Sequence, residues 1–145
     1  MEWCDSCLSE KIGASLDPLE ALEMLYQVSK GLDFIHGGGI AHLDVKPDNM
    51  YRSNNGVYKL GDFGCAEFTS IIKEGVEGGD RRYMPAEILN GGRCEHLDKV
   101  DIFSLGASTY ELVRGQELPR EGDEFNKLRM GNLDLPPKSQ TSLGV

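Results

Sequence analysis

The sequence His42-Leu43-Asp44-Val45-Lys46-Pro47-Asp48-Asn49 places an acid, a lysine and an amide close together in one short stretch. Asp62-Phe63-Gly64 follows and supplies a second acid. Between them, two short β-prone segments flank Asn54-Asn55-Gly56, a tight-turn sequence. A loop rich in Asp and Asn is often only a turn. The hairpin, however, carries Asn49 at one end and Asp62 at the other, which predicts a single site.

The side-chain types in these two motifs suit phosphoryl transfer, in which a protein mainly positions reactants and neutralises charge. We expect Asp44 to accept the proton of a substrate hydroxyl and Lys46 to stabilise charge on the transferring group. Asn49 offers a carbonyl oxygen and Asp62 a carboxylate, both hard ligands suited to Mg²⁺. We therefore predict Asp44 and Lys46 as catalytic, Asn49 and Asp62 as metal ligands, and Lys46, Asn49 and Asp62 as nucleotide contacts.

The two motifs resemble the protein kinase signature H-R-D-L-x-x-x-N followed by D-F-G. The family's Arg is replaced by Leu43, and its later A-P-E is transposed to Pro85-Ala86-Glu87. The resemblance implies ATP and Mg²⁺ as cofactors and a protein as substrate. It also implies that Met1–Asp5 is the hinge between two lobes, with Glu2 and Cys4 beside the adenine.

Helix signals flank these motifs. Asp17-Pro18 predicts a helix start, and an apolar stripe continues to the Gly37-Gly38-Gly39 stop through the positions Leu22, Leu25, Val28, Leu32 and Ile35. Asp98 is expected to cap a second helix that ends at Gly115, and a third is expected over Glu124–Met130. Between the motifs and these later helices, Cys65–Arg82 reads as an exposed loop that matches the family's activation segment.

The second predicted helix contains Asp101-Ile102-Phe103-Ser104-Leu105-Gly106, which is similar to the kinase element D-x-W-S-x-G. An acid there is often just a favourable first-turn charge. Because its surroundings are apolar, we expect Asp101 to be buried and to hold the backbone of His42–Asn49, the stretch that resembles the kinase catalytic loop. The predicted fold is α+β and mainly α-helical: a protein-kinase-like C-terminal lobe with a short β-hairpin, truncated at both ends.

Two further stretches narrow the resemblance to the Wee1/Myt1 kinases: Glu77–Tyr83 and Glu117–Asp123. His96–Gly106 is most similar to plant-type Wee1. One departure is Gly78-Gly79, where the family usually has a single Gly. The resemblance implies an inhibitory kinase that modifies a tyrosine of a cyclin-dependent kinase. Lys46, two residues after Asp44, is instead the pattern of Ser/Thr kinases.

Composition restricts the partners. The chain has 145 residues and a formal net charge of −9, from 24 acidic and 15 basic residues, which argues against nucleic acid or an anionic membrane as partner. No membrane helix or signal-peptide pattern is visible. We expect the four cysteines to be free thiols, and a nuclear or cytoplasmic location, the nucleus being implied by the resemblance.

Residues 1–145 are expected to form a partial kinase domain: hinge, catalytic loop, D-F-G turn, activation segment and following helices. They contain neither a G-x-G-x-x-G loop nor the V-A-I-K lysine, so we expect this chain alone to be inactive. Two functions therefore remain open. One is a catalytic kinase, favoured by Asp44, Lys46, Asn49 and Asp62; the other is a truncated or pseudokinase-like binding module.

Overall fold

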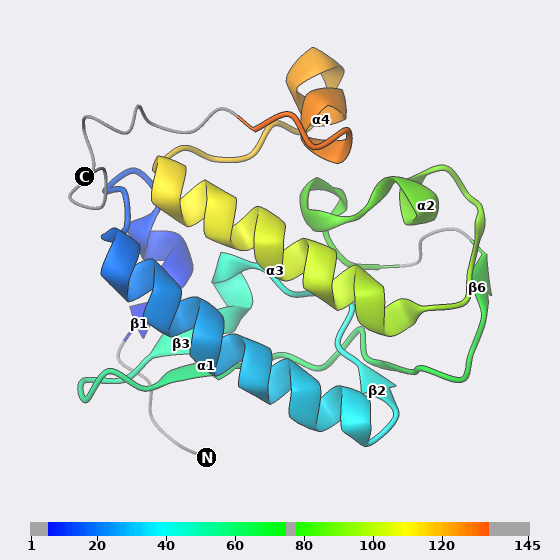
Figure 1. The fold of residues 1–145 in the computed structure, drawn as a ribbon, viewed down its shortest axis with the longest axis horizontal. Helices are drawn as coiled ribbons and strands as arrows, with labels where there is room; N and C mark the ends of the chain where they lie inside the picture. The colour runs from blue at the N-terminus through cyan, green and yellow to red at the C-terminus, as the bar shows by residue number, and fades with distance from the viewer. Residues whose placement is uncertain (1–5, 75–77, 134–145) are drawn as a thin grey trace.

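Two long helices form the centre of the computed structural model, which describes residues 6–74 and 78–133 (Figure 1). Helix α1 spans Pro18–Gly37 and helix α3 spans Leu97–Arg114, and the two lie side by side. The antiparallel hairpin of β3 (Met50–Arg52) and β4 (Tyr58–Leu60) packs against α1. The predicted hairpin and the α+β, mainly helical class are confirmed.

Short elements complete the fold. Strand β1 (Ser6–Cys7) pairs antiparallel with β3 and makes the hairpin a three-stranded sheet of order β1-β3-β4. The remaining strand pairs, helices and 3-10 turns are β2 (Ile40–Ala41) with β5 (Glu67–Phe68), β6 (Lys73–Glu74) with β7 (Arg93–Cys94), α2 (Ala86–Leu89), α4 (Gly122–Arg129), and turns at Leu8–Lys11, Pro47–Asn49 and Arg81–Tyr83.

Helix α1 begins as its sequence predicts. The Asp17 carboxylate accepts a hydrogen bond from the backbone N–H of Leu19 at 2.8 Å, and Pro18 takes the first helical position. The predicted apolar stripe is wrong at its first position, because Leu22 is 56% exposed. At 3.6 residues per turn, Leu22 lies about 120° round the helix from the buried Val28.

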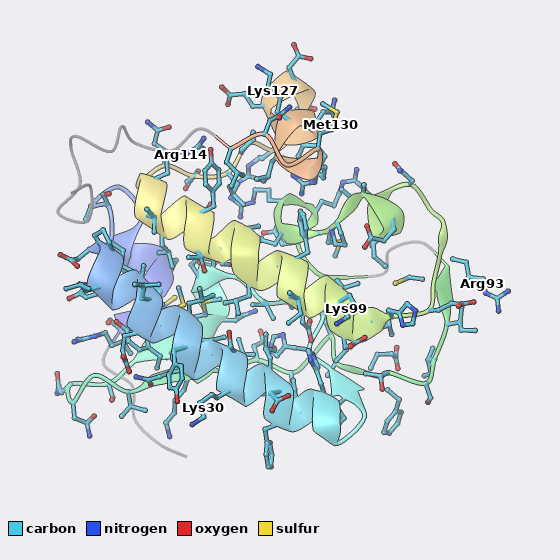
Figure 2. All side chains as sticks on the ribbon, viewed as in Figure 1. Lys30, Arg93, Lys99, Arg114, Lys127 and Met130 are labelled. Carbon is cyan, nitrogen blue, oxygen red and sulfur yellow. The ribbon has the colours of Figure 1, made fainter. Side chains whose placement is uncertain are left out.

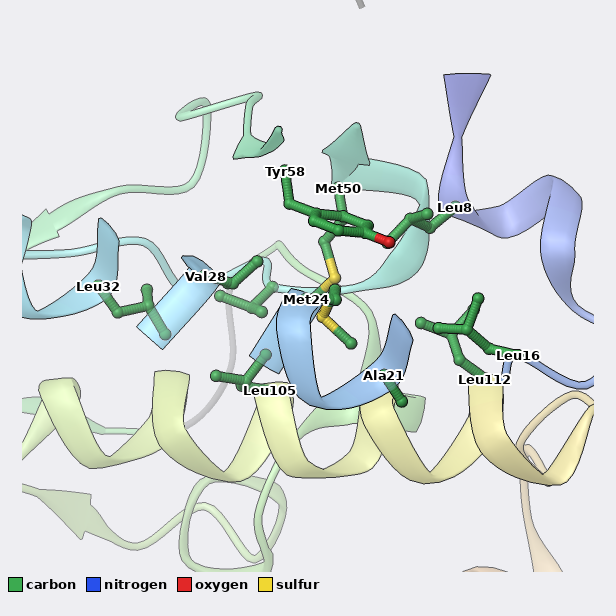
Figure 3. Packing of buried hydrophobic residues seen from close by; sticks show 11 residues of the cluster. Leu8, Leu16, Ala21, Met24, Val28, Leu32, Met50, Tyr58, Leu105 and Leu112 are labelled. Atoms are coloured by element: carbon green, nitrogen blue, oxygen red, sulfur yellow. The ribbon is translucent and has the colours of Figure 1, made fainter. Parts of the chain in front are cut away.

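The buried face of α1 consists instead of Ala21, Met24, Val28 and Leu32. Figure 3 shows these side chains between α3, which contributes Leu105 and Leu112, and the hairpin, which contributes Met50 and Tyr58. The helix is therefore covered on both sides, and this cluster fixes the position of the hairpin that follows the catalytic loop. Leu25 and Ile35 are only partly buried and pack at its edge.

Two helix boundaries differ from the predictions. Helix α3 has His96 as its N-cap, without a side-chain capping bond, so Asp98 lies inside the first turn and does not cap. Its end at Gly115 is confirmed, with a φ of 75° that glycine adopts without strain. Helix α4 begins at Gly122, before the predicted Glu124. Across the described residues, no helix combines the length and the apolar character needed to cross a bilayer.

The segment Cys65–Arg82 is not the featureless loop that its composition predicts. Its described residues contain strands β5 and β6, which pair with strands outside the segment. Each strand has only two residues, too short to show the period-two pattern by which strands are recognised. These pairings tie the segment to the region before the catalytic loop and to the region after α2.

The corrected α1 stripe yields a paired stability prediction. We expect Met24→Ala to lower the free energy of unfolding by about 2–5 kcal/mol, because Met24 is fully buried between the helices and the hairpin. Leu22→Ala, on the same helix, should change it by no more than about 0.5 kcal/mol. Urea unfolding of both variants checks this, and a larger loss for Leu22→Ala would restore the stripe read from the sequence.

Candidate active site

One buried carboxylate, that of Asp101, binds the backbone of the catalytic loop. Asp101, fully buried on α3, accepts hydrogen bonds from the backbone N–H groups of His42 at 2.7 Å and Leu43 at 2.8 Å. His36 of α1 places its Nε2 at 2.8 Å from the same carboxylate. The predicted structural role of Asp101 is therefore confirmed. Leu43 has a φ of +66°, an unfavourable value for a branched side chain, which these bonds help to hold.

His42 links this loop to the Asp62-Phe63-Gly64 turn. Its buried ring accepts a hydrogen bond at Nδ1 from the backbone N–H of Asp44, at 3.1 Å, so the proton belongs on Nε2. Nε2 lies 2.7 Å from the carbonyl oxygen of Gly61 and donates to it. The ring also meets Phe63 edge to face, with centroids 4.7 Å apart. The two motifs that the sequence separates are thus adjacent.

Asp44 presents an unused acceptor. Its Oδ2 accepts a hydrogen bond from Asn49 Nδ2 at 3.1 Å. Its Oδ1 is buried and has no hydrogen-bond partner in the part of the chain that the structure describes. Burial raises the pKa of Asp44, and the positive charge of Lys46 and the bond from Asn49 oppose that rise. A buried carboxylate oxygen without a donor is costly, which is typical of an atom that accepts from a ligand.

Lys46 lies among three carboxylates. Its Nζ is 3.5 Å from Asp80 Oδ2 and 3.9 Å from both Asp44 Oδ1 and Asp48 Oδ2. The ammonium group therefore stands next to the unused oxygen of Asp44 and is held there from the activation segment. A cation in this position is suited to stabilise negative charge that develops beside Asp44.

The two predicted metal ligands lie at the open end of the hairpin. Asn49 is buried, and its Nδ2 donates to the Asp44 carbonyl oxygen at 2.7 Å as well as to the Asp44 carboxylate, which leaves Oδ1 without a donor among the described residues. The backbone N–H of Gly61 donates to the Asn49 carbonyl oxygen at 2.8 Å and brings Asp62 close. Asp62 is exposed, and its charge contributes to the raised pKa of Asp44.

These ligands fit a magnesium ion that arrives with a nucleotide. Over the described ranges, no group of three or more His, Cys, Asp or Glu side chains forms a closed metal cage. Mg²⁺ usually takes one or two protein oxygens and completes its shell with phosphates and water. One free amide oxygen and one exposed carboxylate meet that requirement.

The activation segment is ordered beside this site by an ion pair. Asp80 accepts from Arg82 three times: from Nε at 3.2 Å, from Nη2 at 2.9 Å and from the backbone N–H at 3.0 Å. Burial alone would raise the pKa of Asp80, but these bonds and the charges of Arg82 and Lys46 lower it below its usual value. Asp80 is thus paired with both Arg82 and Lys46.

Gly79 explains part of the unusual Gly78-Gly79 sequence. Its φ is +74°, and a Cβ there would lie 2.5 Å from Met84 Cε and 3.1 Å from the Leu43 carbonyl oxygen. The activation segment therefore passes against the catalytic loop at a point where the positive φ and the nearby Leu43 carbonyl oxygen favour glycine. That close approach brings the next residue, Asp80, within reach of Lys46.

Other predicted residues lie elsewhere. Glu2 and Cys4 fall outside the described residues. Glu87, the acid of the transposed Pro85-Ala86-Glu87 sequence, is exposed and forms no ion pair with any described residue. The described cysteines Cys7, Cys65 and Cys94 are free thiols, as predicted.

Sequence reasoning missed a buried polar cluster on α3. The Tyr83 hydroxyl donates to Glu111 Oε1, and the backbone N–H of Leu118 donates to Oε2 at 2.7 Å. Ser104 donates to the Tyr83 carbonyl oxygen at 2.7 Å. Burial and the Glu111 carboxylate raise the pKa of Tyr83, so the phenol stays protonated. The available signal was a polar stripe at helical spacing, Ser104, Ser108 and Glu111, inside an otherwise apolar helix.

Comparisons with known proteins show the family of this chain. The family model described as "Protein kinase domain" matches residues 1–141. Over 138 residues the chain is 62% identical to the "Wee1-like protein kinase" of Oryza sativa subsp. japonica, covering 94% of this chain and 26% of that protein. For the protein of the same name in Arabidopsis thaliana, the identity is 50% over 141 residues, covering 94% and 27%.

A fungal relative has the same kind of name. The "Mitosis inhibitor protein kinase wee1" of Schizosaccharomyces pombe is 39% identical over 132 residues, covering 89% of this chain and 15% of that protein. The chain thus spans about a quarter of the length of the plant relatives. The family match over nearly all of its residues shows that this chain belongs to the protein kinase family, with Wee1-like kinases among its relatives.

Proposed function

We propose that the complete protein containing this chain transfers the γ-phosphate of ATP to a hydroxyl of a protein substrate, with Asp44 as the base. The observation that carries this proposal is the buried Asp44 Oδ1, which has no donor among the described residues and lies 3.9 Å from the Lys46 ammonium. A substrate hydroxyl would supply the missing donor. Asp44 would then orient the hydroxyl oxygen and accept its proton, and Lys46 would stabilise the charge on the transferring group.

Asn49 and Asp62 would hold the Mg²⁺ that accompanies the nucleotide. When bound, that ion neutralises phosphate charge. The chain's own contribution is to orient the two ligands: Asp44 fixes the Asn49 amide, and the hairpin bond between Gly61 and Asn49 brings Asp62 to the same side. The hinge assignment of Glu2 and Cys4 at the adenine, and the partial-domain boundaries 1–145, remain proposals from the resemblance.

The proposed substrate is an inhibitory tyrosine of a cyclin-dependent kinase, in cell-cycle control in the nucleus. Support comes from the relatives, two of which carry the name Wee1-like protein kinase and one the name mitosis inhibitor. Lys46 by itself follows the pattern of Ser/Thr kinases, so the tyrosine rests on that relationship. The competing function, a binding module without catalysis, does not explain the unused acceptor on Asp44.

The base assignment predicts a loss of transfer in Asp44→Asn. In the complete protein, we expect the rate of transfer to fall by about 10²- to 10⁴-fold while nucleotide affinity is kept. Asp48→Asn is the matched control, because Asp48 is in the same loop at the same distance from Lys46 but is half exposed. Normal turnover by folded Asp44→Asn protein would remove Asp44 as the base, whereas absence of transfer by the parent protein would favour the binding module.

The same variant has a stability readout. A raised pKa in the folded state means that ionised Asp44 is disfavoured there, so its stabilising contribution is present below the ordinary Asp pKa and is lost as pH rises through the raised value. At neutral pH, Asp44→Asn should therefore keep or raise the melting temperature. A lowered melting temperature would indicate that Asp44 is a structural residue.

The metal assignment predicts a magnesium-dependent loss in Asp62→Ala. We expect nucleotide affinity measured with Mg²⁺ by titration calorimetry to fall by about tenfold or more. Affinity without metal should change little, because the exposed Asp62 carboxylate forms no ion pair with a described residue. Glu95→Gln, an exposed acid far along the chain, serves as the control. Equal losses with and without Mg²⁺ would exclude Asp62 as a ligand.

The activation segment predicts activity without phosphorylation. Leu43, which replaces the family's Arg, has no group that could bind a phosphate on the activation segment. Asp80 instead bonds Arg82 and Lys46 without any modification. We expect enzyme co-expressed with a phosphatase, and shown by mass spectrometry to be unmodified over residues 65–83, to be active. Asp80→Asn should lower that activity by about tenfold, since charge-assisted bonds are lost on a partly buried group.

Activity that appears only after modification of Thr69, Ser70 or Tyr83 would refute this prediction. The Tyr83 hydroxyl is a poor site for phosphorylation in the folded protein, because the residue is 4% exposed and its hydroxyl bonds Glu111. Glu95→Gln is again the control: Glu95 pairs with Arg93 at the surface, where such a pair contributes little.

A further inference from the structure

One arginine joins α4 to the activation segment. Arg129 donates from Nη2 to the carbonyl oxygens of Arg81 and Arg82, both at 2.8 Å, and from Nε to that of Met84 at 3.1 Å. Three carbonyl groups in a stretch of four residues are therefore bound by a single planar group. Figure 1 shows α4 as a separate short helix, and the bonded residues Arg81 and Arg82 lie 48 and 47 positions before Arg129 in the chain.

Contacts with Phe125 and Phe103 fix the orientation of the Arg129 side chain. Its Nη1 donates to the carbonyl oxygen of Phe125 one turn earlier, at 3.3 Å. Its guanidinium carbon lies 3.7 Å from the centroid of the Phe125 ring and 5.7 Å from that of Phe103 on α3. Stacking on an aromatic ring restricts the side chain and directs its N–H groups outwards as a fork.

Among the described residues, no acid forms an ion pair with the charge of Arg129. Burial, with a smaller effect from Arg81, lowers the pKa of Arg129 to about 10, which still leaves the group charged at neutral pH. A charged donor bound only to backbone carbonyls makes strong hydrogen bonds to the main chain, and it does so whatever side chains those residues carry.

The bound stretch lies next to the proposed catalytic groups, and Met84 packs against Leu43 of the catalytic loop. It directly follows Asp80, which holds Lys46 beside the unused oxygen of Asp44. It also includes Tyr83, which is anchored to Glu111 on α3. Asp80 and Tyr83 fix the two sides of the stretch. Ser104 binds the Tyr83 carbonyl group, and Arg129 binds the carbonyl groups of the other three residues.

We propose that Arg129 is a positioning residue for the protein substrate: it holds the main chain of Arg81–Met84 against the catalytic loop, so that a polypeptide is received in register with Asp44. The proposal rests on the kinase function proposed above. It concerns the protein substrate and not the nucleotide, because the hydrogen bonds of Arg129 go to Phe125, Arg81, Arg82 and Met84 and not to the proposed metal ligands Asn49 and Asp62.

The test uses the complete protein with Arg129→Ala, Arg129→Lys and the control Lys127→Ala. Lys127 is an exposed cation on the same helix, labelled in Figure 2, and its replacement removes the same charge. We expect Arg129→Ala to raise KM for the protein substrate by about tenfold, equivalent to about 1.4 kcal/mol, with KM for ATP unchanged. Arg129→Lys should recover only part of this, because an ammonium lacks the planar fork. Lys127→Ala should match the parent protein.

Hydrogen exchange supplies a readout that needs no activity. The amide N–H groups of Tyr83 and Met84 bond the carbonyls of Asp80 and Arg81 within this stretch, and both should exchange faster in Arg129→Ala only. Faster exchange in a protein that transfers no phosphate would sink the kinase function but keep the anchoring role. Unchanged exchange, an unchanged protein-substrate KM, or an equal rise in KM for ATP would each overturn the proposal.

Discussion

The site depends on a single buried carboxylate, that of Asp101. It receives two consecutive backbone N–H groups, from His42 and Leu43, and contacts His36 on α1. Since Asp101 is fully buried, losing these donors would leave a charge without compensation in the core, so the bonds are strongly favoured. They join α1, α3 and the catalytic loop at one point, and they stabilise the left-handed backbone of Leu43 that turns the chain towards Asp44.

Helix α3 repeats this arrangement along its length. Ser104 bonds the backbone of Tyr83, Ser108 has a longer contact of 3.5 Å to the carbonyl of Val45, and Glu111 bonds the Tyr83 hydroxyl and the N–H of Leu118. A buried helix with polar side chains on one face specifies which loop lies at which turn, because each loop must satisfy a particular group. The catalytic loop and the activation segment are thereby placed by the same helix.

Charge is balanced locally around Lys46 even though the chain is acidic overall. Asp80 lies nearest and is itself paired with Arg82, so the lysine is held without being fully neutralised by Asp44. Asp44 thus keeps an oxygen that no described group uses. The activation segment contributes to the site through its backbone as much as through its side chains: Gly79 allows the close approach, and Arg129 binds the carbonyl groups that follow.

The sequence by itself determined the two long helices, the hairpin and the side-chain types that the candidate site contains. Spacing within His42–Asn49 and Asp62–Gly64, the turn at Asn54–Gly56 and the helix start at Asp17 are all local patterns, and the structure has them where they were predicted. It also indicated that Asp101 supports the loop, because an acid in apolar surroundings requires donors. The sequence predicted the buried face of α1 less well. A stripe that advances in steps of three residues drifts round the helix, and the predicted stripe therefore included the exposed Leu22.

Only the tertiary structure decided which groups meet. The Tyr83 hydroxyl bonds Glu111, and Arg129 binds carbonyl groups up to 48 positions away in the chain. The packing also leaves one buried oxygen of Asp44 without a donor among the described residues. No periodicity encodes such contacts, since they depend on how α3 and α4 pack against the activation segment. An arginine that binds main-chain carbonyls is especially hard to recognise, because its partners are groups that every residue carries.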